Sequence, residues 1–240
     1  MTGAFLNALG ILLGALFGLA QRAPLSLRTQ DYFRRALGAF TVFFGLRLVW
    51  LSVNGTFGSC AKQLFIALLA VLFGNWLGRL LHLQKISNRL GRFAGNLIAS
   101  RQSTTPVRAR DGFLACTVLF CAAPLGLLGV VTDGLAGDYY LLAAKAVMDG
   151  LAMTGFIKIF SWPAALSAFP VYAIFGALTL ACQSGAKPLL DAHGLLDSVN
   201  VAAGLVACAV ALVILEVRKV ELANYLPALV VAPGLAWLFR

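Results

Sequence analysis

The chain has 240 residues, of which 60% are hydrophobic and only 12% are charged, and its mean hydropathy is +0.88. This composition excludes an ordinary soluble domain and predicts a polytopic membrane protein. The formal net charge of +10 does not indicate a nucleic-acid partner, because no aromatic-plus-basic motif accompanies it.

Apolar windows that reach or approach the ~18 to 20 residues needed to cross a membrane follow one another along the chain. They cover residues 3–20, 36–53, 62–81, 112–131, 139–160, 163–181, 199–215 and 225–239. The last two are short. Each span must be helical, because lipid offers no hydrogen-bond partners to an exposed backbone. We therefore expect an all-α transmembrane bundle of about seven to eight helices.

Prolines interrupt several of these windows. Pro124, Pro170, Pro227 and Pro233 lie inside candidate spans and should kink or break them. Broken helices at membrane depth are tolerated where they line a cavity, so this feature favours a transport pathway.

The organisation is that of one membrane domain, 1–240, with helical halves at 1–81 and 112–240. Between them, at 82–111, six apolar residues recur at helical spacing with Lys85, Arg89 and Arg92 among them. This pattern predicts an amphipathic basic helix on the inner membrane surface, or alternatively a docking site for an acidic partner. Residues 100–110, which contain the sequence STTP, resemble a flexible linker.

The positive charges alternate between the two sides of the predicted membrane. Arginines and lysines gather between spans one and two, three and four, and seven and eight, whereas the opposite loops hold only Lys62 and Lys187. Under the positive-inside rule the basic loops are cytoplasmic, and both termini lie outside if eight spans exist. The first span lacks a preceding basic region, so we expect it to remain as a helix.

Cysteines and histidines give no sign of a metal or cofactor. The five cysteines are scattered without a C-x-x-C pair, and His82 and His193 fall on opposite predicted sides. A disulfide between Cys60 and Cys182 is a minor alternative. We expect no metal and no cofactor.

Small residues repeat every four positions in two spans. Gly10, Gly14 and Gly18 in the first span, and Gly74 and Gly78 in the third, predict close helix packing. Asn7 and Asn200 lie near the starts of the first and seventh spans, by duplication or by chance, and we include both as candidate site residues.

Charges also fall within the stretch from Val131 to Gly150. Gly137 and Asp138 resemble a helix start with Asp138 as the N-cap. At 100° per residue, Asp138, Lys145 and Asp149 then share one face, and Asp149 lies roughly 16 Å below Asp138, near the bilayer midplane.

Such a carboxylate costs ~2.5 to 3.5 kcal/mol to insert, so it should face a partner or a cavity. One interpretation is a structural Lys145–Asp149 ion pair. A second is a site for an ion, proton or small solute, in which Asp149 coordinates or titrates and Lys145 sets its charge. A third is a helix that starts later, which would leave Asp149 at the interface. The candidate site residues are Asp149, Lys145, Asp138, Asp133, Asn7 and Asn200, whereas Arg47 is expected to reach the outer interface without a functional role.

Four segments carry a resemblance to a known family. They begin at Gly3 (GAFLNALGILLG), Thr117 (TVLFCAAPLG), Asp133 (DGLAGD, followed by KAVMDG from Lys145) and Asn224 (NYLPALVVAP). Together they resemble the YqgA/YdfK-like family of bacterial inner-membrane proteins, catalogued as a domain of unknown function, although Pro124 departs from the expected pattern. The resemblance implies a multi-pass protein of the bacterial cytoplasmic membrane, considered a transporter without an established substrate.

Three functional classes follow. A transporter or channel for an ion or small solute fits the midplane charges, the interrupted helices and the absence of a soluble domain. A structural or regulatory membrane subunit would need only helix packing and the basic helix. An intramembrane enzyme would use Asp133, Asp138 or Asp149 as a carboxylate pair, but no nucleophile or cofactor motif joins them, so we expect no enzyme. The expected partners are the lipid bilayer and an ion or small solute; a homo-oligomer is left open.

Overall fold

A computed structural model describes residues 1–21, 26–99 and 109–239. Helices are the only regular secondary structure in the described residues, which confirms the all-α prediction. The helices are α1 (Thr2–Ala20), α2 (Leu27–Ser52), α3 (Phe57–Leu80), α4 (Leu83–Ala99), α5 (Ala109–Ala122), α6 (Pro124–Ala136), α7 (Tyr140–Phe160), η2 (Trp162–Ser167), α8 (Ala168–Ala181), η3 (Cys182–Ala186), α9 (Lys187–Ala192), α10 (Leu196–Ile214), η4 (Leu222–Tyr225) and α11 (Ala228–Leu238).

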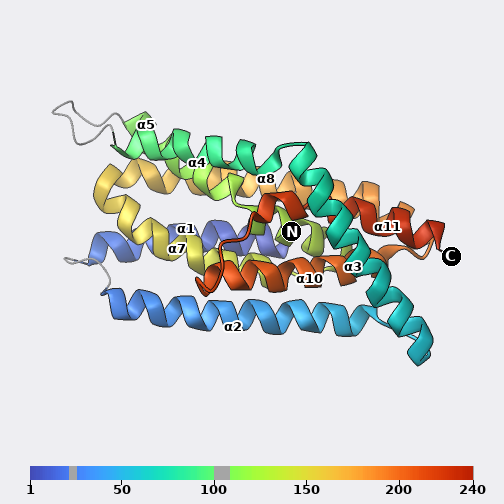
Figure 1. Ribbon diagram of the computed structural model, residues 1–240. Coiled ribbons are helices and arrows are strands. Elements are labelled where there is room, and N and C mark those ends of the chain that lie inside the picture. Colours follow the sequence, from blue (N-terminus) through green and yellow to red (C-terminus); the bar gives the residue numbers. More distant parts are fainter. Residues whose placement is uncertain (22–25, 100–108, 240) are drawn as a thin grey trace.

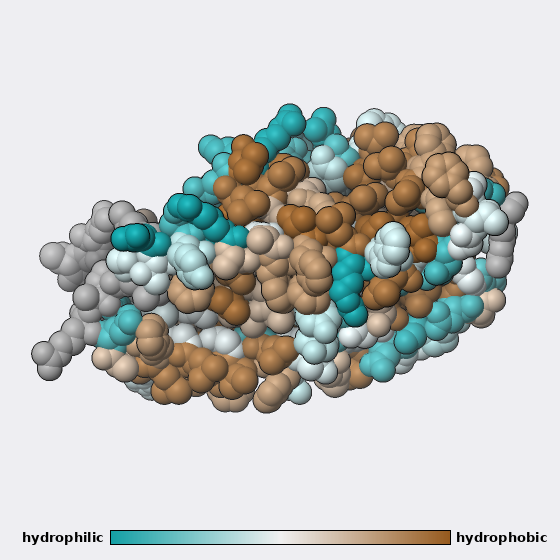
Figure 2. Space-filling model, turned by 90° about the horizontal axis from the view of Figure 1, so that it is seen from below, coloured by the Kyte–Doolittle hydropathy of each residue, from teal (hydrophilic) through white to brown (hydrophobic). Residues whose placement is uncertain are grey.

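These helices form one elongated bundle. Figure 1 shows α1, α2, α7, α8 and α10 running along its long axis, while α3 crosses obliquely. Within the described residues, six helices are long and apolar enough to cross a membrane, or seven if a bent pair counts as one span. Brown side chains cover much of the face in Figure 2, as expected for a surface that meets lipid.

The predicted fourth and eighth spans depart from single continuous helices. The fourth is the pair α5 and α6, bent by 59°, with Ala123 extended and Pro124 at the first position of α6. The eighth is the short helical segment from η4 to α11, in which Pro227 precedes α11. Proline lacks the N–H that a continuous helix needs, which explains the bend before Pro124 and the change from 3-10 to α-helix at Pro227. By contrast, Pro170 lies in the first turn of α8 and Pro233 inside α11.

The glycine rows bring helices into backbone contact, as predicted. A Cβ on Gly14 of α1 would collide with the carbonyl oxygen of Gly150 on α7, and one on Gly78 of α3 would collide with that of Asn224 in η4. Only a residue without a side chain permits this approach. The first and second halves of the sequence are therefore packed against each other through glycines.

The predicted amphipathic helix exists as α4. It packs against α5 and contacts η4, and Figure 1 shows it beside α5 at one edge of the bundle. Leu97 and Ile98 contact a buried core cluster, whereas Ile86 and Phe93 are exposed. Its position on a membrane surface stays a prediction. Most of the predicted linker, residues 100–108, lies outside the described residues.

Candidate functional site

The charged stretch lies at the join between α6 and α7. Gly137 adopts a left-handed conformation (φ 70°) and ends α6, where glycine is favoured. The first helical residue of α7 is Tyr140, so Gly137 and Asp138 do not start that helix and Asp138 is not its N-cap. Asp149 is the tenth of the 21 residues of α7, which rules out the late helix start that would have placed it at the interface.

The structure places the charged candidates of this stretch in three separate locations, and it separates Asp138 from Lys145 and Asp149, with which it was predicted to share a helix face. Asp133, near the end of α6, accepts a hydrogen bond of 3.1 Å from the backbone N–H of Gly3 at the start of α1. Asp138 accepts a hydrogen bond of 3.0 Å from Arg47 on α2. Only Lys145 and Asp149 remain together, because Asp138 precedes α7, where its Oδ1 accepts from the Tyr140 N–H and its Oδ2 from Arg47 of α2.

Arg47 has a larger role than an interfacial charge. Besides its ion pair with Asp138, its guanidinium lies 5.2 Å from the ring centroid of Tyr140. Burial raises the pKa of Asp138, while the Tyr140 N–H and Arg47 act in the opposite direction. This cluster ties α2 to the connection before α7. The sequence does not predict it, because Arg47 and Asp138 are 91 residues apart.

Lys145 and Asp149 form an ion pair one helical turn apart on α7. Lys145 is only 1% exposed, and its side chain passes over Gly126 of α6, where an added Cβ would lie 2.8 Å from Cε. The ammonium nitrogen Nζ lies 5.2 Å from the ring centroid of Phe175 on α8 and 5.8 Å from that of Phe120 on α5. A carboxylate and two ring faces therefore surround the charge from three helices.

Asn7 completes this arrangement from α1. Its side chain is fully buried and lies beside Asp149, close enough to act on its charge. Among the described residues, however, neither its amide nitrogen nor its amide oxygen has a hydrogen-bond partner. Buried side chains elsewhere, such as Ser167 and Thr179, share this state, so it does not by itself identify a ligand; what the geometry gives is a buried amide next to the Lys145–Asp149 pair.

The remaining candidate is elsewhere. Asn200 is buried on α10, a helix that packs mainly against α2, α3 and α11. The structure thus brings together Lys145, Asp149 and Asn7 but not Asp133, Asp138 or Asn200. Phe120 and Phe175 were not predicted, because phenylalanines are common in apolar spans and carry no distinguishing spacing.

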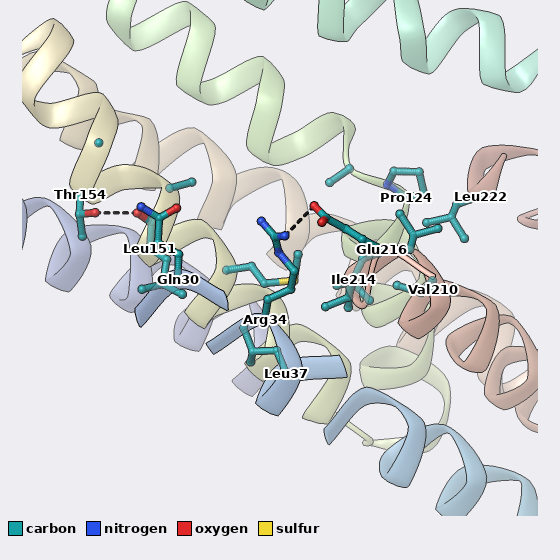
Figure 3. Close-up of a pocket in the computed structure, with 16 residues that line it drawn as sticks. Gln30, Arg34, Leu37, Pro124, Leu151, Thr154, Val210, Ile214, Glu216 and Leu222 are labelled. Atoms are coloured by element: carbon teal, nitrogen blue, oxygen red, sulfur yellow. Dashed lines mark hydrogen bonds and ion pairs between the residues drawn. The ribbon is translucent and has the colours of Figure 1, made fainter. Parts of the chain in front are cut away.

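A pocket of about 570 Å³ opens between α2, α6, α7 and α10. It is lined by the helix break at Pro124, by Leu151 of α7 and Ile214 of α10, and by the charged side chains of Arg34 and Glu216. Figure 3 shows these two side chains pointing toward each other across the pocket. We refer to it as the α2–α7–α10 pocket.

Metal and disulfide chemistry find no support within the described residues. No group of three or more His, Cys, Asp or Glu side chains is placed to hold a metal ion. All five cysteines, including Cys60 and Cys182, are free.

Comparisons with known proteins agree with the family resemblance. The chain is 30% identical over 240 residues to "Uncharacterized protein YqgA" of Escherichia coli (strain K12), covering 98% of this chain and 97% of the relative. It is 25% identical over 234 residues to "Uncharacterized membrane protein YdfK" of Bacillus subtilis (strain 168), covering 97% and 94%. No solved structure matches significantly. The model of the family described as "Protein of unknown function (DUF554)" matches residues 2–237, and the chain therefore belongs to that family of uncharacterised membrane proteins.

Proposed function

We propose that this membrane protein is a transporter or channel for an ion or small solute, and that Asp149, Lys145 and Asn7 form its intramembrane site. The observation that carries the proposal is a charged pair, Lys145 and Asp149, buried in the middle of α7 with the Asn7 amide beside it. Ionisable side chains inside a membrane are costly, and they commonly mark an ion or solute pathway.

The surrounding architecture supports the same conclusion. The Lys145 side chain lies against α6 just after the break at Ala123, and interrupted helices commonly form the binding sites of transporters. On α7, Met148 and Ala152 flank Asp149 in sequence and line the α2–α7–α10 pocket. A pocket therefore lies beside α7 near the charged pair, although neither Lys145 nor Asp149 lines it.

A structural or regulatory subunit is the second candidate. It is favoured by the direct pairing of Lys145 with Asp149 and by the close packing of α1 on α7 through Gly14 and Gly150. Under this alternative the pair would neutralise itself and bind nothing.

Asp149→Asn distinguishes the two. We expect a folded protein that has lost ion flux in proteoliposomes and ion-dependent thermal stabilisation, because a ligand stabilises only the state that binds it. Melting temperatures would be measured across pH and across monovalent and divalent salts, in wild type, Asp149→Asn and the Lys145→Met/Asp149→Asn double variant. The double variant should not regain the response, and Asp31→Asn, an exposed carboxylate paired with Arg35, is the matched control.

Full recovery of stability in the double variant, with no ion or pH response in the wild type, would remove this site from any transport mechanism. The packing role would then stand.

We further propose that the chain resides in a bacterial inner membrane with its basic loops in the cytoplasm. Cysteines placed at residues 23–27 should be shielded from an impermeant outer-side thiol reagent, while cysteines at Leu189–Ser198 should react. Most of the first loop lies outside the described residues. The labelling experiment does not require its structure, because it tests only on which side of the membrane the loop lies. A background with the native cysteines replaced by alanine is the control, and exchanged labelling of the two loops would reverse the orientation.

A further inference from the structure

The α2–α7–α10 pocket has the properties of a separate ligand site. Its volume of about 570 Å³ lies within the range of small-molecule sites. Most of its lining is aliphatic, contributed by residues such as Leu37, Leu151 and Ile214, and the charges of Arg34 and Glu216 lie together across it. A ligand that fits must therefore combine an apolar body with a charged group.

The two charges are held unequally. Arg34 Nη1 lies 2.6 Å from Glu216 Oε1, yet the Glu216 side chain is 68% exposed and that of Arg34 is 40% exposed. An ion pair this accessible contributes at most about 1 kcal/mol. Glu216 can consequently move into water at little cost, whereas Arg34 keeps its stem on the pocket wall and offers a planar donor group suited to a carboxylate.

The backbone at Glu216 supports a special role for this side chain. Its φ is +55°, in the left-handed region, at the end of α10. The N–H of Val217 donates to the carbonyl of Leu212, and the N–H of Glu216 donates to that of Val213. This is the helix-ending position where glycine is usual. A glutamate here carries backbone strain of the kind that gathers at ligand sites. Its carboxylate forms the ion pair with Arg34 and so blocks that guanidinium from other anions.

We propose that the α2–α7–α10 pocket binds a small amphipathic organic anion, whose acidic head replaces the Glu216 carboxylate on Arg34 while its apolar body fills the aliphatic part of the pocket. Glu216 thus acts as a built-in competitor for the ligand. This inference does not depend on the proposed transport site, because it uses neither Lys145 nor Asp149.

Octanoate is a suitable probe, measured by isothermal titration calorimetry against protein in nanodiscs of zwitterionic lipid, with empty nanodiscs as blanks. Octanoate should bind, while octanol and octylammonium, which share its apolar body, should bind at least about tenfold more weakly because they cannot pair with Arg34. Arg34→Gln should weaken octanoate binding by a similar factor. Glu216→Gln should strengthen it about two- to fivefold, since the internal competitor is gone.

Matched controls separate this effect from a general change in charge. Asp31→Asn removes a negative charge from the same helix without freeing Arg34, and Arg35→Gln removes the neighbouring arginine, which pairs with Asp31. Neither should alter octanoate binding by more than about twofold. Asp149→Asn should bind octanoate like wild type, so a failure of the transport proposal would leave this result unchanged.

A repeat in nanodiscs containing anionic phospholipid identifies the source of the ligand. Competition by that lipid would assign the site to a lipid head group, and undiminished octanoate binding would assign it to a soluble carboxylate. The proposal is overturned if octanol binds as well as octanoate, if Arg34→Gln has no effect, or if Glu216→Gln leaves the affinity unchanged or lowers it.

Discussion

Replacing Lys145 with methionine should lower the free energy of unfolding in cation-free buffer by about 3–5 kcal/mol, because it leaves the Asp149 carboxylate buried without its counter-charge. Both partners are well buried, with side-chain exposures of 2% for Lys145 and 11% for Asp149. Asp149→Asn should cost about 1–2 kcal/mol less than Lys145→Met. The stranded ammonium retains the faces of Phe120 and Phe175, and a desolvated cation–π contact contributes up to about 2 kcal/mol.

The measurement is a denaturant titration in mild detergent for wild type, both single variants and the Lys145→Met/Asp149→Asn double variant. The double variant should recover most of the loss, because it leaves no unpaired charge. The control is Arg35→Met, which breaks an ion pair of the same i,i+4 spacing at the exposed pair Asp31–Arg35 and should change stability by about 0.5 kcal/mol or less. Equal losses in the two buried single variants would show that the two rings do not stabilise the ammonium.

The substitution Gly14→Ala should lower the free energy of unfolding by about 1–3 kcal/mol or more. This loss is expected even though alanine has a helix propensity about 1 kcal/mol more favourable than that of glycine. The new Cβ would collide with the carbonyl oxygen, carbonyl carbon and Cα of Gly150. These are backbone atoms of a packed helix, so no side-chain rotation relieves the overlap and α1 must move away from α7.

Gly155→Ala on α7 is the matched control, because a Cβ there meets no atom within 4 Å. It should leave stability unchanged or raise it by up to about 1 kcal/mol. The melting temperature should therefore fall in Gly14→Ala and stay unchanged or rise in Gly155→Ala. If the two variants have the same melting temperature, the close contact of α1 with α7 is not a stabilising feature.

The sequence determined the fold class and the helical packing surfaces. Long apolar windows can only be helices in lipid, and this local requirement makes the spans, the bend at Pro124 and the amphipathic α4 predictable from composition and period alone. Pro170 and Pro233, by contrast, do not interrupt α8 and α11. Glycines at four-residue spacing likewise predicted close packing in α1 and α3, since the spacing itself sets the helix face. The sequence did not predict which helices these glycines contact, namely α7 for Gly14 and η4 for Gly78.

The tertiary structure decided which charges meet. On a helical wheel Asp138 shares a face with Lys145 and Asp149, but the left-handed turn at Gly137 and the start of α7 at Tyr140 remove Asp138 from the helix, and Arg47 attracts it from α2. The meeting of Asn7, Phe120 and Phe175 around Lys145 and Asp149 joins side chains from four helices. The approach of Arg34 to Glu216 likewise joins residues 182 positions apart. Charge pairing at close range depends on distances of a few ångströms that only the packing of whole helices sets, whereas sequence spacing fixes positions only along a single helix.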